Sequence, residues 1–100
     1  MNYFIRMRDD TIEPVDKVHP FIYGGISLFT WYHKECREFQ VIETTTGLLV
    51  SRDTTEEEVI KEAKKQINVV GLDKVKEMII EHQKKTGYIP PKPIQNTMVL

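Results

Sequence analysis

The sequence predicts an α+β domain in which a mostly antiparallel sheet of about four strands is followed by a C-terminal helical hairpin packed on one face of the sheet. Short stretches rich in apolar residues occupy the first half of the chain, at about residues 3–8, 26–33, 39–43 and 48–51. Two amphipathic stretches, each ended by a glycine, occupy the second half. The predicted order is therefore four strands and then two helices.

Residues 26–33, Ile-Ser-Leu-Phe-Thr-Trp-Tyr-His, form the predicted central strand. Successive side chains of a strand point to opposite faces of the sheet, so Leu28 and Thr30 share one face. Phe29 and Trp31 share the other face. Both faces therefore need a cover, and a helical hairpin supplies only one.

The segment before the central strand has no apolar period. Pro14 and Pro20 lack amide donors, so we expect residues 12–20 to form an extended loop. Gly24 and Gly25 predict a bend or bulge immediately before the central strand. From the central strand onward, the predicted strands follow one another as a meander.

The start of the first helix is the clearest boundary in the sequence. Asp53 or Thr54 can cap it, and Thr55 and Glu58 have the spacing of a capping box. Gly71 ends the helix, because glycine accepts the backbone conformation that a helix C-cap requires. The predicted apolar stripe comprises Ile60, Ala63, Ile67 and Val70.

The second helix begins near Asp73 and ends at Gly87 in the same way. Its predicted apolar stripe comprises Val75, Met78, Ile79 and His82. We expect His82 to be a partly buried packing residue whose ring nitrogens are satisfied. The resulting domain organisation is a single domain over residues 1–87 and a proline-containing tail over residues 88–100.

Composition narrows the classes of function. The net charge is −1, from 14 basic and 15 acidic side chains, so no overall field attracts a polyanion. Cys36 is the only cysteine, which excludes an intramolecular disulfide. Because no secretory leader or membrane span is found, we expect a cytoplasmic protein with no membrane partner.

The sequence contains no recognisable catalytic set. His33 and Cys36 are the only histidine and cysteine close in sequence, and a Cys36-dependent enzyme is the least favoured alternative. The spacing of the histidines and the cysteine matches no metal motif, and no phosphate-binding loop follows the glycines. We therefore predict no catalytic residues, no metal and no cofactor.

The aromatic residues are the remaining signal, because eight of the nine precede residue 40. We predict that Phe4, Tyr23, Phe29 and Trp31 form an interaction surface on the sheet face opposite the helices. The predicted function is a small non-enzymatic interaction module of the accessory, adaptor or inhibitor type, which self-associates as a homodimer or binds another protein. The competing interpretation is that the N-terminal loop folds over this face.

A second function uses the same surface to stack single-stranded nucleic acid, with Arg6, Arg8, Lys34 and Arg37 as phosphate contacts. The acidic balance of this half of the chain ranks it second. In the tail, Pro90, Pro91 and Pro93 have the spacing of a peptide read by aromatic grooves. The alternative for this segment is a C-terminal strap.

Overall fold

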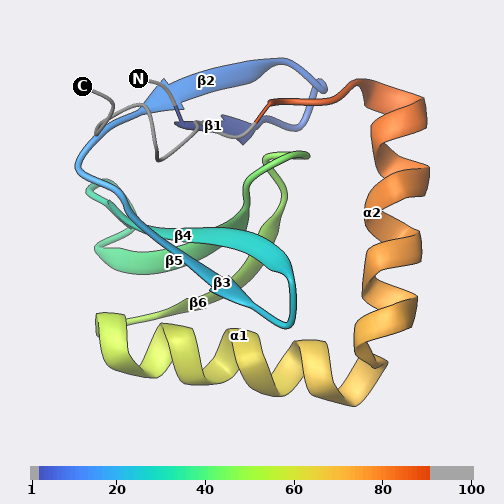
Figure 1. Cartoon of the computed structure of the whole chain (residues 1–100). Helices are drawn as coiled ribbons and strands as arrows, with labels where there is room; N and C mark the ends of the chain where they lie inside the picture. The colour runs from blue at the N-terminus through green and yellow to red at the C-terminus, as the bar shows by residue number, and fades with distance from the viewer. Residues whose placement is uncertain (1–2, 91–100) are drawn as a thin grey trace, which may run out of the picture.

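A computed structural model describes residues 3–90 of the chain, and it confirms the α+β class. Six strands precede two helices along the described part of the chain. The elements are β1 (Tyr3–Arg6), β2 (Ile12–Val15), β3 (His19–Tyr23), β4 (Ile26–His33), β5 (Glu38–Glu43), β6 (Leu49–Asp53), α1 (Glu56–Val70) and α2 (Leu72–Thr86). The two helices follow the strands, as predicted (Figure 1).

The main sheet is a four-stranded antiparallel meander in the order β3-β4-β5-β6. Tyr23 pairs with Ile26, so Gly24 and Gly25 are the two residues of a tight hairpin turn. Both have positive φ, 58° and 83°, which is the backbone that a two-residue turn of this twist requires. The predicted bend or bulge is therefore a hairpin turn, and it makes residues 19–23 a strand.

The N-terminal segment forms a second, two-stranded sheet. The predicted loop over residues 12–20 is wrong in part, because β2 pairs with β1 in the register Tyr3 to Val15 and Phe4 to Pro14. A two-stranded sheet has only edge strands, which is where proline is tolerated. This hairpin lies on the side of the main sheet away from α1 (Figure 1).

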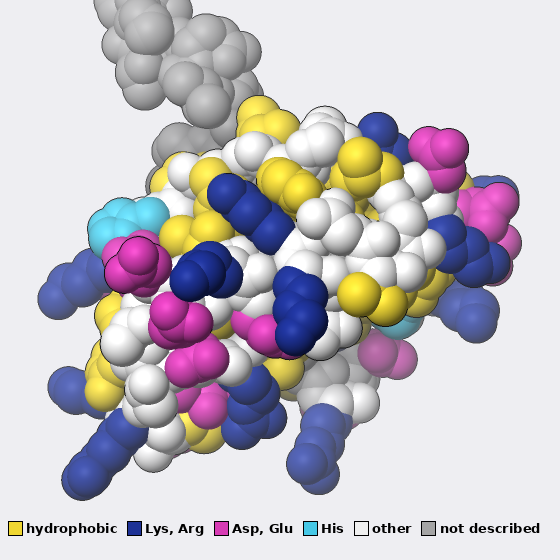
Figure 2. Space-filling view, turned by 90° about the horizontal axis from the view of Figure 1, so that it is seen from below, with side chains coloured by type: hydrophobic (Ala, Val, Ile, Leu, Met, Phe, Trp, Pro, Cys, Tyr) yellow, Lys and Arg dark blue, Asp and Glu magenta, His cyan; other side chains and the backbone are white. Residues whose placement is uncertain are grey.

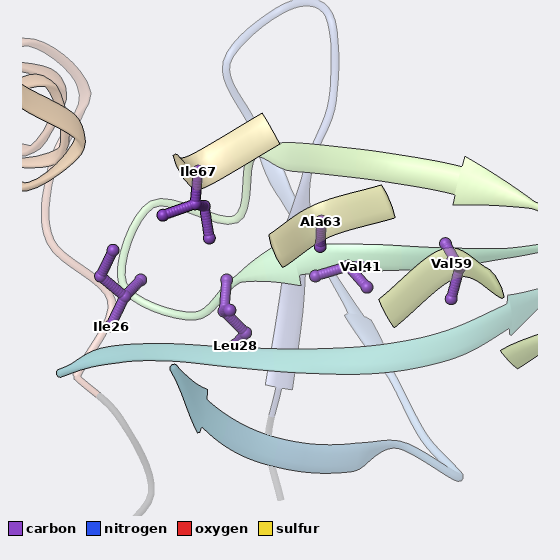
Figure 3. Packing of buried hydrophobic residues seen from close by; sticks show 6 residues of the cluster. All are labelled: Ile26, Leu28, Val41, Val59, Ala63 and Ile67. Carbon is purple, nitrogen blue, oxygen red and sulfur yellow. The ribbon is translucent and has the colours of Figure 1, made fainter. Parts of the chain in front are cut away.

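Helix α1 closes one face of the main sheet. Thr55 caps it, with its side chain accepting a hydrogen bond from the Glu58 amide at 3.2 Å. Its buried residues are Val59, Ala63 and Ile67, a row spaced at every fourth position. They pack on Ile26, Leu28 and Val41 of β4 and β5, as the labelled side chains in Figure 3 show.

The predicted stripe of α1 is only partly right. Ala63 and Ile67 are buried as expected, but Val59 takes the third buried position. Ile60 is half-buried, and Val70 remains 45% exposed. The helix is therefore turned toward Val59, so that one row of three residues meets the sheet and Val70, at the end of the stripe, faces outward.

Helix α2 leaves α1 at Gly71, whose φ is 101°, and runs along the side of the sheet toward the N-terminal hairpin (Figure 1). None of its residues is buried. Beyond it, Ile89 is 5% exposed and donates its amide to the Thr45 carbonyl at 2.8 Å. The chain is thus docked through Ile89, beyond the boundary predicted at Gly87. Within residues 3–90, neither helix is long and apolar enough to cross a membrane.

Candidate binding groove beside helix α2

The predicted aromatic surface is largely covered. Phe29 is 0% exposed, and its ring meets the Tyr3 ring edge-on, with the centroids 5.0 Å apart. The expectation that Phe29 stands on an open sheet face is therefore wrong. The N-terminal hairpin, unlike an irregular loop, has an apolar side of its own, and it supplies the second cover that the central strand needs.

The other predicted aromatics belong to three different strands. Trp31 is half-buried and donates from Nε1 to Gln40 Oε1 at 3.1 Å. Tyr23 packs against the core on the α1 side, and its hydroxyl donates to Asn68 at 2.9 Å. Phe4 is half-buried in β1. Contact of Trp31, Tyr23 and Phe4 with a partner stays a prediction, but the buried Phe29 is not part of an exposed patch with them.

The four predicted phosphate contacts are also separated. Arg6 is used internally, donating from Nε to the Thr46 carbonyl at 2.9 Å and from Nη1 to the Asp10 carbonyl at 2.7 Å. Arg8, Lys34 and Arg37 are exposed. Arg8 belongs to the β1–β2 turn and the other two to the β4–β5 turn, and these turns lie at opposite ends of the view in Figure 1.

Charge is mixed on the outer side of α1 as well. Seen from below α1, Figure 2 shows acidic and basic side chains interspersed, with no continuous field of one sign. Such a surface gives little steering toward a polyanion. Of the prolines of the predicted peptide-like tail, Pro90 is exposed. Pro91 and Pro93 lie outside the described residues.

Cys36 is exposed in the β4–β5 turn. Its amide donates to His33 Nδ1 at 3.2 Å, and its Sγ lies 3.9 Å from His33 Nε2. This is a local turn contact. Over residues 3–90, no group of three or more histidine, cysteine or carboxylate side chains is arranged to hold a metal.

A different site lies between α2, α1 and the sheet. The first end of α2 is fixed by Leu72, which sits so close to Gly24 that a Cβ there would come within 2.4 Å of Leu72 Cδ2. A larger residue at position 24 would have to displace the Leu72 side chain and would also be strained by the positive φ of 58°. The β3–β4 turn and the start of α2 are thus locked together.

The second end of α2 is fixed to the β5–β6 turn by hydrogen bonds. Gln83 Nε2 donates to Thr45 Oγ1 at 2.8 Å, and the Ile89 amide donates to the Thr45 carbonyl. Arg6 Nη1 reaches the Thr86 carbonyl at 3.5 Å. Since both ends are fixed to turns of the sheet, the middle of α2 spans the space between them.

That space is a cavity of about 250 Å³, which we call the α2 groove. Its lining comes from the sheet and from both helices. The lining residues are Ile26, Leu28, Glu43, Thr46, Leu48, Leu49, Val50, Gln66, Ile67, Val70, Val75, Met78, Ile79 and His82. Three of them, which we call the groove rim, are half exposed: Leu49 at 46%, Val70 at 45% and Met78 at 52%.

Two ionisable side chains line this mostly apolar groove. Glu43 is 5% exposed, and its Oε1 accepts from the amide and the hydroxyl of Thr46 at 2.9 and 2.7 Å. Its Oε2 accepts from the amide of Thr45 at 3.1 Å. The turn that follows β5 therefore satisfies this carboxylate.

His82 differs from Glu43 because one of its polar atoms is not hydrogen-bonded. Its Nε2 is buried and has no hydrogen-bond partner among the described residues. The expectation that its ring nitrogens are satisfied is wrong, because α2 is fixed at its ends and does not bring a polar group of the sheet to this nitrogen. Leaving such a group unpaired costs about 1–3 kcal/mol. Its position on the apolar stripe of α2 is the only sequence signal that pointed to it.

A second polar cluster links the sheet to the start of α1. Glu56 Oε2 accepts from the Thr30 hydroxyl at 2.6 Å and lies 2.6 Å from His19 Nδ1. The Thr30 hydrogen bond, followed by the His19 contact, lowers the pKa of Glu56 below its ordinary value. The cluster fixes β3, β4 and α1 to one another.

No protein-family model, curated protein or solved structure matches this chain.

Proposed function

We propose that the chain is a non-enzymatic protein-interaction module that self-associates through the groove rim. The observation that supports this is the rim itself, where three aliphatic side chains, each about half exposed, line a mostly apolar groove. Contiguous exposed apolar side chains are typical of interaction surfaces. The surface differs from the aromatic face that the sequence suggested, and the class of function is the same.

The second copy is the partner that the geometry favours. Helix α2 is amphipathic, yet it buries no residue in the single chain. A two-fold contact places one rim against the other, so that a single patch hides two sets of aliphatic side chains. A different protein with exposed apolar side chains could contact the same rim. An accessory or adaptor role is therefore the alternative outcome of the test.

The other predicted functions gain less support. A single-strand binding surface needs basic side chains around one stacking face, whereas Arg6 is engaged internally and Lys34 and Arg37 belong to a different turn from Arg8. A Cys36-dependent enzyme needs a third group that orients the base. We also propose a cytoplasmic location, since Cys36 is exposed and unpaired, as is typical of reducing compartments.

The experiment is a comparison of two charge insertions by sedimentation and light scattering over a range of concentrations. Met78→Glu places a charge on the rim, and we expect it to weaken self-association at least about tenfold, since an interface then buries an unpaired carboxylate. Ile22→Glu is the control, because Ile22 is 68% exposed on β3, away from the rim.

Circular dichroism of both variants verifies that they are folded. A parent protein that stays monomeric at millimolar concentration would contradict the homodimer. Equal weakening by Met78→Glu and Ile22→Glu would contradict the rim as its interface.

A further inference from the structure

The outer edge of β6 is an interaction surface distinct from the groove rim. We propose that an extended segment of another protein adds to β6 as a fifth strand of the main sheet, and that this segment carries a cationic side chain followed by apolar ones. The open backbone edge, the groove beside it and the charge of that groove each specify part of this partner.

Strand β6 is the outermost strand of the main sheet, opposite β3 (Figure 3). The Glu43 amide donates to the Leu48 carbonyl, so every second residue of β5 bonds toward β6. Ser51 and Asp53 face the next two of these residues in the register of the pair. The amide and the carbonyl of Arg52, which lies between them, therefore point outward, where β6 has no neighbouring strand within residues 3–90.

The outer edges of β2 and β3 are each closed by a proline. In β3, Tyr23 closes the hairpin turn and bonds toward β4, so Pro20 faces the other way and has no amide to offer there. In β1, the Arg6 amide donates to the Gly47 carbonyl, away from β2, so Pro14 also faces outward in the register of that pair. Proline on an edge prevents the addition of a strand. Strand β6 contains no proline, so its edge keeps its amides.

A groove of about 340 Å³, which we call the β6 trough, lies beside this edge. All five residues of β6 line it, together with Glu62 and Gln66, one turn apart on α1. Ser51 Oγ donates to the Val59 carbonyl at 2.7 Å, which fixes α1 against β6. Extended peptides bind exposed sheet edges through main-chain hydrogen bonds, and the surface beside the edge selects their side chains. The trough shares only Leu49 with the groove rim.

Charge in the trough favours a cationic segment. The half-buried Glu62 accepts a hydrogen bond from Gln66 at 2.7 Å, and Asp53 accepts one from the next amide of the chain. Neither carboxylate forms an ion pair in the described part of the chain. Arg52, the one basic residue that lines the trough, is ion-paired with Glu38 of β5 at 3.1 Å. The trough therefore has an excess of negative charge, which a lysine or arginine complements.

The alternation of side chains sets the order of the partner residues. Ser51 is buried on the α1 side, so Asp53 shares its face and Arg52 points to the other face. In antiparallel addition, the partner residue opposite Asp53 comes before the residue opposite Leu49. Leu49 is 46% exposed, so it offers an apolar contact. The cationic side chain therefore comes first, and apolar side chains follow it at alternate positions.

The test uses heptapeptides and amide chemical shifts in NMR titrations of the full chain. The parent peptide is acetyl-Thr-Lys-Thr-Val-Thr-Val-Thr amide, in which lysine and both valines share one face of a strand. We expect saturable binding, with shifts centred on residues 50–53 and 62–66. A peptide with glutamate in place of lysine should bind at least about threefold more weakly, because it brings like charges together.

N-methylated peptides test the main-chain hydrogen bonds. Methylation of the threonine that follows lysine should weaken binding at least about tenfold, because it removes the amide that bonds to the Arg52 carbonyl. Methylation of the valine that follows this threonine is the matched control. Its amide points away from β6, so affinity should change by less than about threefold.

Variants of the chain locate the site. Glu62→Lys should reverse the preference, so that the glutamate peptide binds more tightly than the lysine peptide. Glu57→Lys is the matched control, because Glu57 is exposed on the same helix and does not line the trough. Arg52→Pro should abolish binding, because it removes the outward amide of the edge. If Arg52→Pro fails to fold, the N-methylated peptides test the same edge without altering the chain.

Absence of saturable binding by the lysine peptide would overturn the proposal, as would unchanged affinity after methylation of the threonine. Equal affinity for the lysine and glutamate peptides would overturn the cationic partner. Shifts centred on residues 70 and 78 would place the peptide at the groove rim and overturn the edge site.

Light scattering separates this site from self-association through the rim. We expect Arg52→Pro to self-associate as the parent does, since position 52 is not part of the rim. Loss of self-association in a folded Arg52→Pro variant would make a second copy the occupant of the edge and overturn the partner segment. Peptide binding by a chain that stays monomeric would contradict the homodimer and leave the edge site standing.

Discussion

Helices α1 and α2 have the same length and closely similar sequence signals, yet they have different roles in the fold. Each spans fifteen residues, has an apolar stripe and ends at a glycine with positive φ. Helix α1 buries Val59, Ala63 and Ile67, whereas α2 buries no residue. An apolar stripe therefore predicts which side of a helix turns inward, but not whether another element meets it.

The largest expected difference between the helices lies in stability. Ile67→Ala should lower the free energy of unfolding by about 2–5 kcal/mol, because it removes a side chain that is 2% exposed from the core of α1. Ile80→Ala on α2 should change it by less than about 0.5 kcal/mol. Urea denaturation measures both, and equal losses would contradict the contrast between the helices.

The next largest effect on stability is expected at the contact between Gly24 and the first turn of α2. Gly24→Ala should destabilise the protein by about 1–3 kcal/mol, because alanine strains a φ of 58° and its Cβ meets Leu72. Gly87→Ala is the control, since its φ of 107° is strained but nothing lies within 4 Å. Only Gly24→Ala should also speed hydrogen exchange throughout α2.

A double-mutant cycle tests whether Leu72 is the cause. In a Leu72→Ala background, the further loss from Gly24→Ala should shrink to that of backbone strain alone. An unchanged loss would show that the turn, and not the contact with α2, accounts for the effect.

The pH dependence of stability tests the attachment of α1 to the sheet through Glu56. Because its contacts lower the pKa of Glu56 from its ordinary value of 4.5, Glu56 contributes stability that is present above pH 4.5 and is lost as pH falls through the lower folded-state pKa. Glu56→Gln should remove this part of the acid dependence in unfolding measurements. Glu57→Gln, on the next residue, should retain it.

The smallest expected effect concerns the aromatic sheet face. Trp31→Ala should leave self-association within about threefold of the parent, because Trp31 does not line the α2 groove and its Nε1 is paired with Gln40. Loss of assembly in Trp31→Ala, with assembly retained in Met78→Glu, would restore the aromatic face as the interface.

Features that depend on neighbouring residues could be predicted from the sequence, and features that depend on distant contacts could not. The cap at Thr55 and the stops at Gly71 and Gly87 were predictable, since each depends on residues within one turn of the chain. Strand β2 was missed, because Pro14 argues against a strand unless its position at an edge is known.

The sequence by itself determined the class of the domain, the central strand, the limits of α1 and the end of α2, because backbone propensity, capping and apolar period act over a few residues. The predicted Asp73 cap is wrong, since α2 begins at Leu72, directly after Gly71, with no side-chain cap. Tertiary structure alone decided that Phe29 is covered by Tyr3 and that α2 spans a cavity containing His82. These outcomes depend on contacts between segments far apart in the chain, such as Leu72 with Gly24 and Gln83 with Thr45. Periodicity specifies an apolar side, and only packing specifies what fills the space beside it.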